Sequence, residues 1–181
     1  MRAIIISCMF LGGCGLVEQT IDEYTPPSYV QEHYVYVNRD NTSGQNLLSA
    51  YRFINYSEQT HRAELKEFIG VDPVRTEWCA AFVNAVLNES GIAGSESVSQ
   101  YPLTARSFLE WGEEVDEPKP GDLVVFPRGN QGWQGHVGFY LGTSLINGET
   151  FYQILGGNQS NKVSIELYPA RSKLGIRRQL T

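Results

Sequence analysis

The spacing of apolar residues changes once along this chain, at the turn Pro118–Gly121. Before the turn, apolar side chains recur every three or four positions, which predicts helices. These helices are expected over residues 44–69 (two helices broken near 55–60), 76–91 and 104–112. After the turn come short β-rich runs bounded by Gly, Pro or Asn, at 122–126, 136–141, 150–155, 162–167 and 176–180. Helices followed by successive hairpin strands predict an α+β fold, with an antiparallel sheet packed on the N-terminal helices.

The ends of the predicted helices carry ordinary capping residues. Gly70 and Gly91 fit C-terminal stops, since glycine adopts the left-handed backbone that ends many helices. Thr76 and Thr104 are candidate N-caps, because a threonine hydroxyl can accept from a free N–H of the first turn.

The first residues read as an export signal. An apolar run from Ala3 to Leu11 is too short for a bilayer span of about 20 residues, and it matches a signal-peptide core of roughly 7–15 residues. The following Leu11-Gly12-Gly13-Cys14 resembles a bacterial lipobox, in which Cys14 would be lipidated and become the mature N-terminus. An ordinary signal peptide, or an unprocessed start, is the alternative. Gly15 after the cysteine resembles the sorting signal for the periplasmic face of the outer membrane in Gram-negative cells.

This interpretation divides the chain into three parts: a lipoprotein signal peptide over 1–13, a lipidated tether and lead-in over 14–43, and a folded domain over 44–181. The tether contains Tyr34–Val37, which predicts one short strand. Without the signal about 168 residues remain, enough for one domain with a good core. We expect a monomer attached to the membrane through Cys14.

Charge and motif content exclude two classes of function. A net charge of −6 argues against a nucleic-acid partner, which would call for a basic face. The sequence has no paired-cysteine motif and no HExxH, so neither a metal nor another cofactor is expected.

Of the three cysteines in the sequence, one is expected to remain as a free thiol in the mature chain. Cys8 would leave with the signal and Cys14 would carry lipid, so Cys79 has no intramolecular disulfide partner. Cys79 lies near the start of a predicted helix, where free N–H groups and the helix dipole favour negative charge. Such a position can lower a thiol pKa from about 8.5 to roughly 3.5–7.5 and so produce a nucleophile. A small buried core residue is the alternative.

A thiolate nucleophile needs a base, and the base needs a residue that orients it. His136 opens a predicted strand after a Gly-rich loop, and the next strand returns in a hairpin that brings Asn158 near it. An asparagine carbonyl can fix the tautomer of such a histidine. The alternatives are a surface histidine and a turn asparagine.

Five stretches together resemble the CHAP domain (cysteine- and histidine-dependent amidohydrolase/peptidase) of the NlpC-like papain-fold group. They are VDPVRTEWCAAFVNAVL, TARSFLEWG, PKPGDLVVFPRG, GHVGFYLG and ILGGNQSNKVSI. The closest likeness is to a small bacterial and phage subfamily with WCAAFV, GHVGF and GGNQ. The resemblance covers about residues 44–178. It implies a papain-like fold with Cys79 as nucleophile, His136 as base and Asn158 as the orienting residue.

One departure from the family pattern concerns the orienting residue. Many CHAP domains have a carboxylate two residues before the asparagine, where this chain has Gly156. Asn158 is therefore expected to act alone. Trp78, Arg128 and Trp133 are further candidates for contacts to a peptide or sugar, with a core or solvated-loop role as the alternative for each.

The resemblance implies hydrolysis of an amide bond in peptidoglycan, through a thioester on Cys79. The bond would lie in the stem peptide, in a cross-bridge or between sugar and peptide. A catalytically silent, peptidoglycan-binding lipoprotein of the same fold is one alternative. A phage-derived lysis enzyme, a toxin amidase and an acyl transferase to an amine are others.

Overall fold

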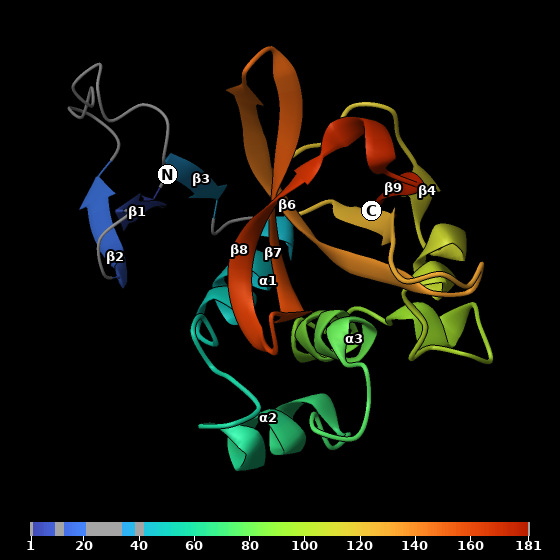
Figure 1. Cartoon of the computed structure of the whole chain (residues 1–181). Helices are drawn as coiled ribbons and strands as arrows, with labels where there is room; N and C mark the ends of the chain where they lie inside the picture. Colours follow the sequence, from blue (N-terminus) through green and yellow to red (C-terminus); the bar gives the residue numbers. More distant parts are fainter. Residues whose placement is uncertain (1, 10–12, 21–33, 39–41, 181) are drawn as a thin grey trace.

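The computed structural model describes residues 2–9, 13–20, 34–38 and 42–180, with side chains from residue 43 to residue 180. Its main feature is a six-stranded antiparallel sheet in the order β4-β9-β5-β6-β7-β8. Helices from the N-terminal half pack against this sheet (Figure 1). The expected α+β fold is therefore confirmed.

The strands run close to the expected segments. Their bounds are β4 Glu113–Glu114, β5 Leu123–Pro127, β6 Gly135–Ile146, β7 Glu149–Gln159, β8 Lys162–Pro169 and β9 Gly175–Arg178. Strands β5 to β8 follow one another as expected, and β6 and β7 form a hairpin longer than the predicted runs. Strand β9 does not extend this series, because it returns across the sheet to pair with β5 and β4.

Three α-helices precede the sheet: α1 Thr42–Tyr51, α2 Arg62–Ile69 and α3 Cys79–Glu89. The break between α1 and α2 and the stop at Gly70, whose φ is 75°, are confirmed. Short 3-10 helices lie at Ser95–Ser97, Ala105–Glu110 and Ala170–Ser172, so the short helix expected after Thr104 is a 3-10 helix.

Helix α3 begins two residues later than predicted. Trp78 is the N-cap residue, and Thr76 does not cap the helix. The Trp78 side chain is fully buried. Burying a side chain of this size contributes more than the roughly 1 kcal/mol of a threonine cap, so tertiary packing decides where the helix begins. Cys79 is consequently the first residue of α3.

Alternate residues of the sheet belong to two apolar clusters. Leu123 and Val125 pack with α1 and α3, whereas Val124 and Phe126 pack on the other face with Tyr140 and neighbouring residues. This alternation follows from the two-residue period of a strand.

Helix α3 and its N-cap residue pack closely against β7 at Gly157. A Cβ atom built there would lie 2.6 Å from Cζ3 of Trp78 and 2.7 Å from Cβ of Phe82. The missing side chain at Gly157 therefore allows the first turn of α3 to rest directly on the sheet backbone.

The N-terminal part forms a separate three-stranded sheet in the order β2-β1-β3 (Figure 1). It contains β1 Arg2–Met9, β2 Gly13–Thr20 and β3 Tyr34–Asn38, so the strand expected at Tyr34–Val37 is confirmed. The lipobox residues Leu11 and Gly12 lie outside the described residues, and Cys14 is described by its backbone in β2. Within the described ranges, no helix is long and apolar enough to cross a membrane.

Candidate active site

The thiol of Cys79 lies between the start of α3 and the start of β6. Its Sγ is 4.0 Å from the carbonyl oxygen of Gly135, and the side chain is 3% exposed. A pocket of about 210 Å³ opens beside it. The walls of this pocket include Glu77, Leu103, Thr104, Arg128, Trp133 and Gln134. A single buried thiol is therefore reached through a small cavity.

The ionisation of Cys79 differs from the expectation for a helix N-terminus. Burial raises the pKa of the thiol, which outweighs the lowering by the Arg128 charge and by backbone hydrogen bonds from Val137 and Ala80. Helix position favours the thiolate, but removing the group from water costs more. In the free protein Cys79 is consequently a protonated thiol at neutral pH, and it needs a base to become a nucleophile.

His136 is the second residue of β6, and its side chain is fully buried. Its imidazole stacks on Tyr168, with ring centroids 5.2 Å apart and 16° between the planes. Of the two ring nitrogens, Nε2 lies 3.0 Å from Oε1 of Gln159, whereas Nδ1 has no hydrogen-bond partner.

The amide of Gln159 is fixed by the backbone around it. Its Nε2 donates to the carbonyl oxygens of Ser164, at 2.6 Å, and Ile154, at 3.3 Å. Because the amide nitrogen faces these acceptors, the oxygen Oε1 must face the imidazole, and Nε2 of His136 must carry the proton. The unprotonated nitrogen is then Nδ1, which is free to accept a proton.

A β-bulge explains why Gln159 meets the histidine. Strand β7 has one more residue than β8 between the pairs Gly156–Ser164 and Gln159–Lys162. In a regular strand Asn158 would share the face of Gly156, but the extra residue brings Gln159 to that face. A Cβ built on Gly156 would lie 3.3 Å from Nε2 of His136 and 3.4 Å from Cδ of Gln159. The carboxamide of Gln159 thus occupies the space above Gly156.

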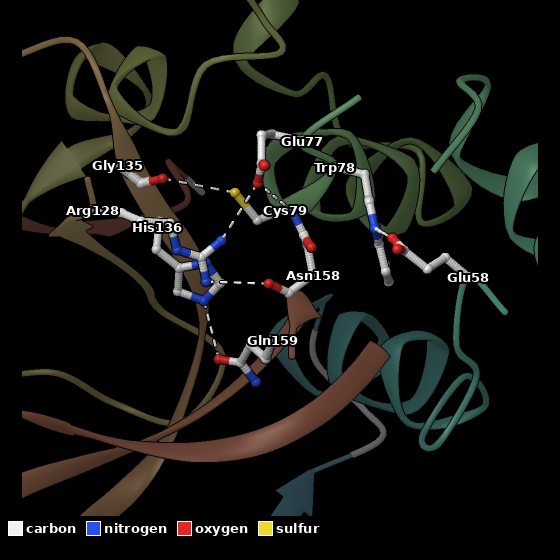
Figure 2. Close-up of polar contacts among 9 residues, drawn as sticks. All are labelled: Glu58, Glu77, Trp78, Cys79, Arg128, Gly135, His136, Asn158 and Gln159. Carbon is white, nitrogen blue, oxygen red and sulfur yellow. Dashed lines mark hydrogen bonds and ion pairs between the residues drawn. The ribbon is translucent and has the colours of Figure 1, made fainter. Parts of the chain in front are cut away.

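Asn158 has a different set of contacts from the one expected. It adopts a left-handed backbone with φ 56°, and its Nδ2 donates to Oε2 of Glu77 at 2.6 Å. Its carbonyl oxygen accepts from Arg128 at 3.1 Å. The structure therefore brings Asn158 into the site, but its side chain contacts Glu77, and Gln159 is the residue hydrogen-bonded to His136 (Figure 2).

The three candidate substrate contacts separate into two groups. Trp78 is fully buried against Phe82 and donates to Glu58 at 3.3 Å, so its ring does not reach the pocket. Arg128 and Trp133 both line the pocket beside Cys79, and Trp133 is 65% exposed. The expectation for Trp78 is corrected to a packing role, because the same residue fixes the start of α3.

The Cys79 thiol lies against the backbone at the start of β6, next to His136 in the chain. The thiol contacts the residues on either side of His136, namely Gly135 and Val137. Arg128 acts on both groups, since its charge lowers the pKa of Cys79 and of His136. Within the described part of the chain, no hydrogen bond joins the Cys79 thiol to the imidazole. Catalytic hydrogen bonds are often long before substrate binds, so the arrangement suits a base that engages the thiol during reaction.

His136 should stay neutral far below the usual pH range of histidine. Burial, together with the nearby Arg128 charge, lowers its pKa from 6.5 to about 3, although the hydrogen bond that Nε2 donates to Gln159 opposes this shift. The unfolded chain would bind a proton at pH below about 6.5, whereas the folded chain would not until pH approaches about 3. Acidification through this window should therefore favour unfolding.

NMR of the histidine ring nuclei, assigned by comparison with His136→Asn, measures this property. We expect His136 to show the neutral form protonated at Nε2, with no titration between pH 8 and pH 5. A midpoint near 6.5, or a proton on Nδ1 in the neutral form, would contradict the geometry described above.

Comparisons with known proteins point to one family. Neither the comparison with curated proteins nor the comparison with solved structures gave a match. The α+β arrangement, with a cysteine at a helix start beside an antiparallel sheet, is that of the papain-like CHAP fold. Over residues 71–158, which include Cys79 and His136, the chain matches the family model of the CHAP domain.

Proposed function

We propose that this protein is a peptidoglycan hydrolase that cleaves an amide bond with Cys79 as nucleophile and His136 as base. The match to the CHAP domain supports amidase or peptidase activity on peptidoglycan in general. One observation carries the finer proposal. The buried imidazole is held by Gln159 through Nε2, its Nδ1 has no hydrogen-bond partner, and the Cys79 thiol contacts Gly135, the residue before His136.

The proposed reaction begins from a neutral thiol and a neutral imidazole. Nδ1 of His136 takes the thiol proton while Sγ of Cys79 bonds to the amide carbon, and the carbonyl electrons move to oxygen. When this intermediate collapses, the C–N bond breaks and Nδ1 returns the proton to the leaving amine. Water, deprotonated by Nδ1, then cleaves the thioester and restores the thiol.

One contact of His136 favours the protonated ring that the reaction requires, although burial and the Arg128 charge oppose it. The imidazolium that forms keeps its Nε2–H bond to Oε1 of Gln159, so the ring holds its orientation while the charge appears. The first N–H groups of α3 have no acceptor within the helix, so they are available to hold an oxyanion on the attacked carbon.

Digestion of purified peptidoglycan sacculi tests the activity. The soluble form, residues 15–181, should release new fragments, and Cys79→Ala should lower the rate by a factor of about 10³ or more, since it removes the nucleophile. Mass analysis of the fragments identifies the cleaved bond. Retained binding to sacculi without fragments from either protein would instead favour the catalytically silent alternative.

A matched pair of variants separates the roles of Gln159 and Asn158. Gln159→Met removes the acceptor at similar volume and should lower kcat about 10- to 100-fold, the usual effect of losing a buried hydrogen bond to a charged group. Gln159→Glu keeps an acceptor and should retain more activity than Gln159→Met. Asn158→Ala should change kcat less than Gln159→Met, with circular dichroism confirming that all three variants fold. The reverse order of the Gln159→Met and Asn158→Ala effects would return the orienting role to Asn158.

We also propose a lipid anchor on Cys14 that holds the enzyme on the periplasmic face of the outer membrane, close to the wall. The lipobox-like Leu11–Cys14 supports this location. The full-length protein should fractionate with membranes and Cys14→Ser should not. Equal membrane association of both forms would contradict the anchor. The enzyme is proposed to act as a monomer.

A further inference from the structure

The guanidinium of Arg128 is held at the pocket wall mainly by uncharged groups. It donates to the carbonyl oxygen of Asn158 at 3.1 Å and lies near the Tyr168 side chain, on whose pKa its positive charge has a lowering effect. The left-handed backbone of Asn158 turns that carbonyl toward Arg128. These partners fix the direction of the guanidinium without neutralising its charge.

Arg128 has one weak carboxylate partner among the described residues. Its NH1 nitrogen is 3.9 Å from Oε2 of Glu77, beyond hydrogen-bond distance, and the Glu77 side chain is 82% exposed. Exposed pairs of this kind contribute little to stability. Glu77 can therefore leave Arg128 at small cost, although Asn158 also holds it through one hydrogen bond.

The pocket beside Cys79 contains no other charged side chain among the described residues that line it. Arg128 and Glu77 are its two charged members, and the remaining walls are neutral. If Glu77 turns outward, an uncompensated positive charge remains in a cavity of about 210 Å³ next to the nucleophile. Arginine is well suited to a carboxylate, because its planar fork makes two parallel hydrogen bonds.

We propose that Arg128 is a specificity residue that binds a carboxylate of the substrate, and that Glu77 occupies this position in the empty protein (Figure 2). The substrate class is an acidic peptide whose free carboxylate lies close to the amide bond that is cleaved. This inference rests on the proposed function and adds to it the chemical feature by which the site selects the bond.

Matched substrates test the proposal. Sacculi are digested before and after their carboxyl groups are converted to primary amides with carbodiimide and ammonia. Wild type should lose about 10- to 100-fold in kcat/KM on amidated sacculi, the usual range for a charge-assisted hydrogen bond. Arg128→Gln should show a similar loss on untreated sacculi and no difference between the two substrates. Thermal melting of Arg128→Gln and Arg128→Lys checks that the fold is kept.

Two results would overturn the inference. Wild type that cleaves both substrates equally shows that no carboxylate is recognised. Arg128→Gln that still prefers untreated sacculi shows that another residue reads the carboxylate. If Arg128→Gln loses kcat on both substrates but still prefers untreated sacculi, Arg128 acts on the oxyanion instead.

A binding measurement keeps the test independent of cleavage. In Cys79→Ala, the NMR signal of the Arg128 Nε–H group is followed while the C-terminal amide of N-acetyl-Ala-Glu, or that of its carboxamide counterpart N-acetyl-Ala-Gln, is added. We expect a shift with the acidic peptide alone, and tighter binding, by up to about five-fold, when Glu77→Gln removes the internal competitor. Absence of the shift would refute the carboxylate site even if sacculi are cleaved. A shift without cleavage would refute the hydrolase and keep the site.

Discussion

The contact of α3 with the backbone of β7 at Gly157 sets the geometry of the whole site. Trp78 and Phe82 rest where a side chain at Gly157 would lie, and this contact fixes where α3 begins. Cys79 is the next residue after Trp78, so the same packing delivers the thiol to the start of β6. The thiol is thus positioned by shape complementarity, and a larger residue at Gly157 would have to move the helix.

Burial governs the chemistry as strongly as it governs the packing. It raises the pKa of Cys79 and lowers that of His136, so each group is held in its uncharged form. A site of this kind resembles a serine–histidine pair more than a preformed thiolate–imidazolium pair, since the proton moves as the substrate is attacked. An uncharged thiol is also less readily oxidised than a thiolate.

Much of this fold follows from residue patterns, but the site depends on details that patterns do not contain. Helical and strand spacing predicted α1 to α3 and β5 to β8, and motif likeness predicted catalytic roles for Cys79 and His136, which stay predictions. The return of β9 to β5 was missed because pairing between distant strands leaves no local signal. The role predicted for Trp78 was wrong, because a tryptophan next to Cys79 in the sequence can be either a substrate contact or a core residue. The lowering predicted for the Cys79 pKa was wrong. Burial raises this pKa, and burial depends on tertiary packing.

The bulge in β7 has a consequence for comparing sequences of this kind. Asn158 and Gln159 exchange places relative to His136 through one extra residue, without any change of side-chain type. A homologue that lacked this insertion would present the asparagine to the histidine instead. A sequence alignment would then place residues with different contacts in the same column. The residue that orients the imidazole is better identified by its distance from the ring than by its alignment column.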